Sequence, residues 1–569
     1  MQMSVNPDHP WCRPGAAAYA RTRVRNILRP SVTVYGAPAE LIKDENISVT
    51  MPDGVVLRVN VYRPPGDGPF PVILSAHPYG KDVLPKRRWW GWSPSPQYRL
   101  MNQTQPLRLS SETGWEAPDP VWWTQHGYVV LNADTRGAGK SEGVGALLSD
   151  QEAQDIYEII EWAGTQPWSN GNVGMLGVSY LAISQYKAAA LHPPHLKAIC
   201  PWEGFTDAYR DLMTPGGIVE DGFSLIWQFG TKLAVRLSED IGAERPKHPL
   251  RDEWWDAMTP DLAGIEVPML VCASFSDGNL HSVGSMRAFD RASSRDKHVY
   301  IHRGPKWTTF YSAEAGAAQL EFLDRHLKGT KGAPIPPVRL EVRERRDVIT
   351  QVRSEQEWPL ARTQWRCLHL SEAGQLRDAP GHDGSVSFDL KRNAASFAIG
   401  FTKDTEITGP MVVRLWASIA GATDASLFVG VEKWSGAEYV PFEGSYGYGR
   451  DRLAAGQLRL SLRKLDAALS ATHRPEHGFR ESEPLGNDPV ELQIPLTASS
   501  TLFRAGDSLR LLIAGRYLEP RNPLFGHFPA HYRPSGTGRC TVHWSADMPA
   551  TLSIPVIPAR QDIRRAPPP

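Results

Sequence analysis

A serine stands between a short apolar run and a helix-like run, which is the setting that nucleophilic acyl chemistry requires. Residues 172–176 read Asn-Val-Gly-Met-Leu, and the next five, 177–181, read Gly-Val-Ser-Tyr-Leu. A serine hydroxyl is a weak nucleophile, so hydrolases hold it on a tight strand-to-helix turn with its Oγ exposed beside a helix N-terminus. Gly177 removes a Cβ that would crowd this turn. Leu181 replaces the second glycine of the usual G-x-S-x-G pattern, but the flanking elements still predict Ser179 as a nucleophile.

A serine nucleophile needs a base and an acid that orients the base, and after a strand-turn-helix nucleophile the chain order is Ser, Asp or Glu, then His. Asp277 lies in the turn that follows the apolar run 269–273. Aspartate before glycine is also an ordinary turn former, but its place after a strand favours a role as the triad acid. His302, which ends the next predicted strand, is the favoured base. His281, four residues after Asp277, is the alternative.

The elements around these residues predict an α/β domain followed by an all-β domain. Short apolar runs alternate with helix-like segments up to about residue 328, which is typical of a mostly parallel, doubly wound sheet. A long, aromatic, helix-prone stretch interrupts this alternation, and after a Pro- and Gly-rich linker the hydrophobic period changes to two. The predicted units are residues 30–205 and 264–333 for the α/β core, 206–263 for a helical cap, 334–563 for a jelly-roll β-sandwich and 564–569 for a disordered tail.

Composition excludes several classes of function. The 569 residues carry 62 basic and 62 acidic side chains, which argues against nucleic acid or an anionic membrane as the main partner. The sequence has no run of about 20 apolar residues and no apolar signal-peptide core, so we expect a cytoplasmic protein outside the membrane. Its five cysteines are widely spaced without a C-x-x-C pair, so we expect neither disulfides nor a metal site. No cofactor motif is present either, because the Gly-rich run 134–143 lacks P-loop spacing.

The same residues resemble a known family, the CocE/NonD-type serine hydrolases, which include cocaine esterase, α-amino acid ester hydrolases and relatives of X-Pro dipeptidyl-peptidases. The resemblance covers nearly the whole chain. Its most specific parts are the run Asp-Thr-Arg-Gly-Ala-Gly-Lys-Ser-Glu-Gly at 134–143 together with Gly-Val-Ser-Tyr at 177–180. Further matches are Met-Pro-Asp-Gly at 51–54, Pro-Tyr-Gly-Lys at 78–81, Ser-Asp-Gly at 276–278 and Phe-Leu-Asp-Arg-His-Leu-Lys-Gly at 322–329.

The resemblance implies an α/β-hydrolase domain with a helical cap and a C-terminal jelly roll. It also implies Ser179 as nucleophile, Asp277 as triad acid, and an oxyanion hole formed by the Tyr79 hydroxyl and the Tyr180 backbone N–H. One departure concerns the base. Family members often carry Gly-Pro-Trp-Ser-His at the triad histidine, whereas residues 304–308 here read Gly-Pro-Lys-Trp-Thr. The base must therefore come from His302 or from elsewhere.

The sequence thus predicts a serine hydrolase that cleaves small carboxylic esters through an acyl-enzyme, with amides as the second substrate class to consider. Acyl transfer to another acceptor by the same residues is one alternative, and a noncatalytic binding protein on a hydrolase fold is another. A homo-oligomer is possible. Aromatic residues near strand ends or in the cap are candidates for an acyl pocket: Trp202, Phe205, Trp227 and Phe275.

Overall fold

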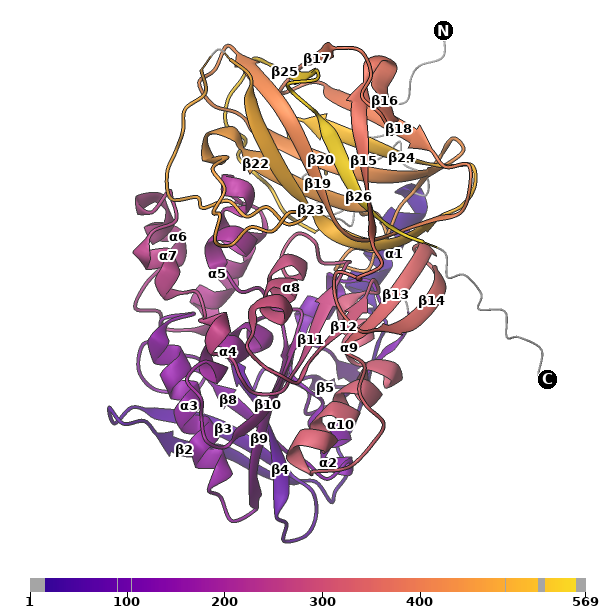
Figure 1. Cartoon of the computed structure of the whole chain (residues 1–569). Coiled ribbons are helices and arrows are strands. Elements are labelled where there is room, and N and C mark those ends of the chain that lie inside the picture. Colours follow the sequence, from indigo (N-terminus) through magenta and orange to yellow (C-terminus); the bar gives the residue numbers. More distant parts are fainter. Residues whose placement is uncertain (1–15, 90, 104, 487, 520–527, 559–569) are drawn as a thin grey trace, which may run out of the picture.

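The computed structural model describes residues 16–558 except 90, 104, 487 and 520–527. The predicted disordered tail at 564–569 lies outside the described residues. The chain forms an α/β domain, indigo to magenta in Figure 1, and an orange-to-yellow β-domain that lies against one end of it. Among the described residues, no helix is both long and apolar enough to cross a membrane.

The first domain is built on one mixed sheet whose centre is parallel. Its strand order is β2-β3-β8-β4-β9-β10-β11-β12-β13-β14, with parallel pairing from β8 to β13 and antiparallel pairing at both edges. The central strands are short and buried on both faces, which explains their continuous apolarity in the sequence. The strands are β2 (Ile42–Thr50), β3 (Val56–Arg63), β4 (Phe70–His77), β8 (Val129–Asp134), β9 (Ser169–Val178), β10 (Leu196–Trp202), β11 (Met269–Ser274), β12 (Lys297–His302), β13 (Val338–Arg345) and β14 (Val348–Glu355).

Helices cover both faces of this sheet. On one face, a core cluster contains residues of α3 (Asp150–Gly164), α4 (Tyr180–Ala189) and α8 (Ser282–Arg291). On the other, a second cluster contains residues of α2 (Pro120–Gln125), α9 (Lys306–Phe310) and α10 (Ala313–Leu327). α3 begins where the Ser149 hydroxyl accepts a hydrogen bond from the Glu152 N–H, an N-cap that satisfies one free backbone donor.

The stretch predicted as a cap is helical. It contains α5 (Phe223–Ala234), α6 (Ile241–Glu244), α7 (Glu253–Ala257) and a π-helical turn, Ala208–Met213. Figure 1 shows α5, α6 and α7 together at one side of the molecule, between the α/β sheet and the β-domain. The remaining N-terminal elements are α1 (Ala16–Leu28), β1 (Val32–Tyr35), β5 (Lys86–Arg88), β6 (Gly91–Ser93) and β7 (Leu107–Ser110).

The β-domain contains antiparallel sheets that enclose a large apolar core. In one sheet the order is β15-β26-β19-β23, and the far end of β19 pairs with β25, which in turn pairs with β17. In the other the order is β18-β24-β20-β22. The strands are β15 (Gln364–Ser371), β16 (Gln375–Arg377), β17 (Gly384–Asp389), β18 (Ala394–Gly400), β19 (Thr405–Ala420), β20 (Ser426–Ser435), β21 (Glu438–Val440), β22 (Ala454–Arg459), β23 (Val490–Phe503), β24 (Asp507–Ala514), β25 (Arg539–Trp544) and β26 (Thr551–Ile557).

The predicted boundary at residue 334 does not separate the two sheets. The alternating pattern of this segment predicts a sandwich strand, yet β13 pairs in parallel with β12, Val299 opposite Val338 and Tyr300 opposite Arg339. It therefore extends the α/β sheet, and β14 follows it as an antiparallel edge strand. An alternating pattern identifies a half-buried strand but does not say which sheet the strand joins.

Candidate functional site

Ser179 lies on a strained turn between β9 and α4. Its backbone has φ 58° and ψ −116°, a left-handed φ that a non-glycine residue adopts only where the surroundings enforce it. A Cβ on residue 177 would collide with the side chain of Leu181, so Gly177 is required by the close return of the chain. The Ser179 N–H donates to the Trp202 carbonyl at 3.0 Å, which ties the turn to β10. This geometry is that of a nucleophile elbow.

The imidazole of His281 contacts the serine. Its Nε2 lies 3.2 Å from Ser179 Oγ, and its Nδ1 lies 2.5 Å from Asp277 Oδ2. Asp277 follows β11, and His281 directly precedes α8 one turn later, with its backbone N–H donating to the Asp277 carbonyl. Both side chains are buried. The three groups form the contacts that a nucleophile, a base and an orienting acid need.

His302, the favoured base in the sequence, does not lie against the serine. Its Nδ1 accepts a hydrogen bond from the Gly304 N–H at 3.0 Å, so its hydrogen is on Nε2, which faces Glu203 Oε1 at 3.1 Å. Both ring nitrogens are thus occupied elsewhere. His302 does end β12 as predicted, but its ring points to the carboxylate that follows β10. The contact to Ser179 instead comes from His281, the alternative.

The two residues expected to form an oxyanion hole lie together. Tyr79 follows β4, and its ring meets the ring of Tyr180 edge-on with centroids 6.2 Å apart. The Tyr79 hydroxyl accepts a hydrogen bond from Trp227 Nε1 at 3.2 Å, so its own hydrogen remains available to donate. The Tyr180 hydroxyl donates to Glu152 on α3 at 2.7 Å, which fixes the start of α4 and so the direction of its backbone N–H.

A carboxyl group that the sequence did not single out lies beside the nucleophile. Glu116 is buried and has φ 65°, and its backbone carbonyl accepts a hydrogen bond from Val178 N–H at 3.0 Å. Its side chain lies against the Ser179 hydroxyl and the Tyr180 N–H. Burial, only partly opposed by the charge of Lys306, raises the pKa of Glu116 to about 8. This carboxyl is therefore mostly neutral at neutral pH, and it lies beside the backbone N–H that the sequence predicts as an oxyanion donor.

Lys306, at the start of α9, reaches the same cluster. Its Nζ lies 2.5 Å from Asp277 Oδ2, 2.9 Å from His281 Nδ1 and 3.6 Å from Glu203 Oε2. Burial favours the neutral amine, but the charges of Asp277 and Glu203 outweigh it and raise the pKa of Lys306. Burial would also raise the pKa of Asp277, yet the charges of Lys306 and His281 hold it well below its usual range. The site therefore contains a fixed ammonium and a fixed carboxylate.

The Gly-rich run at 134–143 positions loops of the site. Asp134 accepts hydrogen bonds from the backbone N–H groups of Lys81 at 2.6 Å and Lys140 at 3.0 Å. Arg136 forms two hydrogen bonds to Asp155 on α3, both 2.7 Å long. Lys81, whose backbone N–H donates to Asp134, follows Tyr79 by two residues. This network therefore holds the loop that carries the candidate oxyanion donor.

Of the four candidate pocket residues, two lie at the site and two do not. Phe205 stacks on the His281 ring at a centroid distance of 6.1 Å, and Trp227 donates to Tyr79. Trp202, by contrast, is fully buried in the core on the α10 face of the sheet. Phe275 packs against Trp358, 5.7 Å between centroids, and both rings line a cavity that contains neither Ser179 nor His281 in its wall. Position near a strand end did not reveal which way each ring points.

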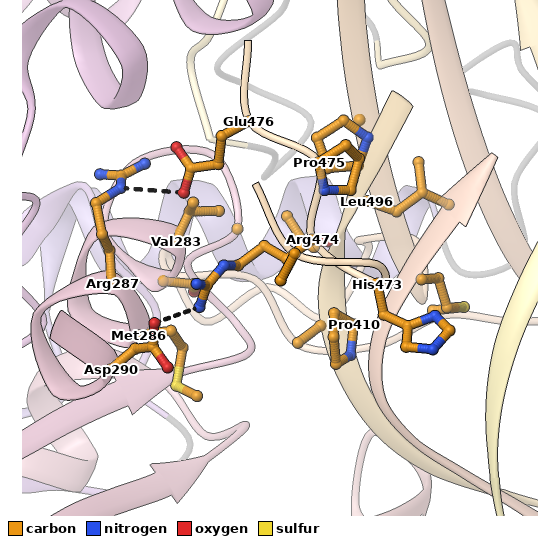
Figure 2. A pocket seen from close by; sticks show the side chains of 18 of the residues that line it. Val283, Met286, Arg287, Asp290, Pro410, His473, Arg474, Pro475, Glu476 and Leu496 are labelled. Carbon is orange, nitrogen blue, oxygen red and sulfur yellow. Dashed lines mark ion pairs between the residues drawn. The ribbon is translucent and has the colours of Figure 1, made fainter. Parts of the chain in front are cut away.

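A cavity of about 640 Å³ lies between α8 and the β-domain, and Phe275 is in its wall (Figure 2). Its lining includes Gly278 and Ser282 from either side of His281, but neither the histidine nor Ser179. Ion pairs cross it from α8 to the segment 471–477 that precedes β23: Arg474 with Asp290 at 2.7 Å, and Glu476 with Arg287 at 3.8 Å. The segment 278–282 therefore has this cavity on one side, whereas the side chain of His281 contacts Ser179 outside it.

One buried group of His, Cys and Glu side chains brings three potential ligand atoms together, but their protonation does not suit a metal ion. Glu203, Cys272 and His302 bring ligand atoms within 4.8 Å of one another. However, His302 presents an N–H rather than a lone pair to Glu203, and burial raises the pKa of Cys272 well above its ordinary value. A divalent cation prefers a thiolate and an imidazole lone pair. These residues do not fit one.

Sequence reasoning missed Glu116, Glu203 and Lys306 and ranked His281 second. A signal for His281 exists, because Asp277 and His281 are four residues apart and can meet across one turn. Glu116, on the loop after β7, and Lys306, the first residue of α9, lie far from Ser179 in the chain, and no local pattern marks them.

Comparison with known proteins finds similar domains over most of the chain. Residues 53–305 match the X-Pro dipeptidyl-peptidase family S15, and residues 332–538 match the X-Pro dipeptidyl-peptidase C-terminal non-catalytic domain. A crystal structure of a CocE/NonD family hydrolase from Staphylococcus aureus is 34% identical and superimposes with a TM-score of 0.85 over 91% of this chain and 94% of that one.

Two further proteins are similar to this chain, one in sequence and one in fold alone. The cocaine esterase of Rhodococcus sp. is 31% identical over 413 residues, which are 61% of this chain and 65% of the esterase, just under two thirds of its length. An aminopeptidase from a Thaumarchaeota archaeon is 18% identical, with a TM-score of 0.68 over 91% of this chain and 97% of the aminopeptidase, and shares the fold.

Proposed function

This chain belongs to the CocE/NonD family of hydrolases, and on that basis we propose that it is a serine esterase that cleaves small carboxylic esters through an acyl-enzyme. The observation that carries the proposal is the chain of contacts from Ser179 Oγ to His281 Nε2 and from His281 Nδ1 to Asp277 Oδ2. No cofactor takes part in the proposed reaction.

In the proposed acylation step, Ser179 Oγ attacks the ester carbonyl while His281 Nε2 takes the hydroxyl proton. Asp277 keeps the Nδ1–H in place and stabilises the imidazolium. The Tyr79 hydroxyl and the Tyr180 N–H then donate to the oxyanion, and each such donor is typically worth about 3 kcal/mol. His281 returns its proton to the leaving oxygen, the alcohol departs, and water repeats the sequence to release the acid.

The neutral carboxyl of Glu116 contacts the Tyr180 N–H in the free enzyme, so the substrate carbonyl must displace it. A protonated carboxyl adds no negative charge to the oxyanion pocket, whereas an ionised one would oppose the reaction there. Burial and the Lys306 charge lower the pKa of His281, which makes it a weaker base. A weaker base favours esters, whose carbonyl carbon is more reactive, over amides.

The test is labelling with a fluorophosphonate, which reacts only with an activated serine. We expect stoichiometric labelling of the native protein, loss of labelling in Ser179→Ala, and hydrolysis of short-chain p-nitrophenyl esters that disappears in the same variant. A folded native protein that neither labels nor hydrolyses any ester would overturn the proposal in favour of a binding role. Product analysis in the presence of added alcohol separates hydrolysis from acyl transfer.

A further inference from the structure

Lys306 contacts both the acid and the base of the proposed triad, and this position is unusual for a cation. Its Nζ lies 2.5 Å from Asp277 Oδ2 and 2.9 Å from His281 Nδ1, and these last two atoms are themselves 2.5 Å apart. The three polar atoms form a closed triangle behind the imidazole. The lysine is 3% exposed, so water does not screen its charge.

We propose that Lys306 is a positioning residue that selects the imidazole tautomer of His281 and keeps the ring unprotonated in the resting enzyme. This inference rests on the proposed function, because it assigns a role to the lysine within the same triad. Lys306 touches no reacting atom in this scheme, and it acts only through His281 and Asp277.

Only one tautomer of His281 can act as a base toward Ser179. His281 Nδ1 has one position in the ring plane, which holds either a hydrogen or a lone pair. With the hydrogen there, it donates to Asp277 Oδ2, and Nε2 keeps the lone pair that a base needs toward Ser179. With a lone pair there, Lys306 donates to Nδ1, and Nε2 carries the hydrogen and cannot act as a base. The shorter contact is the one to Asp277, 2.5 Å against 2.9 Å.

The charge of the lysine strengthens this arrangement. By donating to the same oxygen, Lys306 holds Asp277 as the carboxylate that accepts from Nδ1. Its ammonium also lies beside the ring, and a like charge at this distance disfavours the imidazolium. Burial and this charge lower the pKa of His281, although Asp277 and Glu203 oppose them.

Other groups around the triangle come from several elements. Glu203 follows β10, and its Oε2 lies 3.6 Å from Lys306 Nζ. Its Oε1 accepts a hydrogen bond from Nε2 of His302, at the end of β12. Glu116, on the loop after β7, is neutral at neutral pH. Phe205 covers one face of the His281 ring, and the ring of Trp307 lies 5.4 Å from the ammonium. In this setting the charges of Asp277 and Glu203 keep Lys306 protonated, so its effect on His281 persists over the working pH range.

The consequence for catalysis concerns one proton. It moves from Ser179 Oγ to His281 Nε2 as the bond from Oγ to the carbonyl carbon forms, and then to the leaving oxygen as the ester bond breaks. Lys306 keeps its own protons throughout. Because the ammonium disfavours the imidazolium, the ring gives up the proton readily, and the free enzyme stays competent at acidic pH.

The test is the pH dependence of fluorophosphonate labelling in two variants. Lys306→Met removes the charge but keeps the length, so we expect the acidic limb of the labelling rate to move upward by about one to two pH units. Lys306→Arg keeps the charge and should leave the limb near its native position. The proposal is overturned if the limb of Lys306→Met does not move, or if both variants shift it equally.

A second measurement does not depend on replacing the lysine or on catalysis. In Ser179→Ala protein with isotope-labelled histidine, the His281 ring is assigned by comparison with the protein that also carries His281→Gln, and it is titrated by NMR. We expect a midpoint below about 6.5, the ordinary value. A midpoint at or above that value refutes the role of Lys306, even if Lys306→Met fails to fold. Absence of labelling in the native protein would refute the proposed function instead, and this titration would still decide the inference.

Discussion

Replacing His281 by glutamine should nearly abolish esterase activity, whereas the same replacement of His302 should not. Both residues are 1% exposed, so the two variants are matched in burial. His281→Gln removes the nitrogen that lies 3.2 Å from Ser179 Oγ. Its loss leaves Asp277 paired with Lys306 at 2.5 Å, so no buried charge is left alone and the fold should survive.

The expected magnitude follows from the role of the lost group. A general base typically contributes 10²- to 10⁴-fold, so kcat/KM should fall by about this factor, which corresponds to about 2.7–5.4 kcal/mol of transition-state stabilisation. His302→Gln removes a contact to Glu203 Oε1 at 3.1 Å, while Glu203 keeps Lys306 at 3.6 Å. The His302→Gln variant should lose about tenfold or less in kcat/KM, because the native His302 ring contacts no atom of the proposed triad.

The assay is kcat/KM with a p-nitrophenyl ester, together with the rate of fluorophosphonate labelling, for the native protein and both variants. Thermal unfolding of each variant checks that the fold is retained. A folded His302→Gln protein that loses more activity than His281→Gln would show that the base is His302 in solution, and the contact between His281 and Ser179 would then not be the catalytic one.

Three further perturbations test other parts of the site and the domain interface. Tyr79→Phe should lower kcat by about 10²- to 10³-fold with little change in KM, because one oxyanion donor is lost; a loss below about fivefold would exclude that role. Activity should fall as pH rises through about 8, because the carboxyl of Glu116 ionises there beside the proposed oxyanion pocket. Glu116→Gln should remove this alkaline decline, and a variant whose pH profile matches that of the native protein would contradict the role given to Glu116. Glu476→Gln should lower the free energy of unfolding in urea by about 3–5 kcal/mol, because the buried glutamate pairs with arginines, including Arg291 at 2.9 Å. The exposed control Glu481→Gln should cost less than about 1 kcal/mol, and equal losses would refute the argument.

The positions of Ser179 and Asp277, the proposed nucleophile and acid, could be predicted from the sequence because they depend on local rules. Ser179 follows a buried strand and precedes a helix, and Asp277 follows another buried strand, so parallel strand ends bring them to one edge of the sheet. The base could not be assigned in this way. His302 also ends a strand, but the direction of its ring is set by Glu203 and by the Gly304 N–H, two contacts that no spacing rule contains.

The remaining features depend on packing between distant segments. Lys306 lies in the segment 304–308, which lacks the histidine that family members often carry there. Only the fold brings its ammonium to Asp277. Trp202 and Phe205 are close in the chain, yet one is buried in the core on the α10 face and the other stacks on the His281 ring. β13 has the alternating pattern of a sandwich strand but joins the α/β sheet through β12. Such choices between partners are settled by tertiary contacts rather than by local pattern.

The ion pairs from α8 to the segment 471–477 connect the β-domain to the proposed base, although the β-domain supplies no residue of the proposed triad. His281 directly precedes α8, and the helix is anchored by Arg474 and Glu476 through Asp290 and Arg287. A hydrolase domain produced alone would keep its nucleophile elbow but lose the anchor of its base. Chimeras between family members should therefore exchange α8 and this segment as one unit, since the two sides of the anchor have to match.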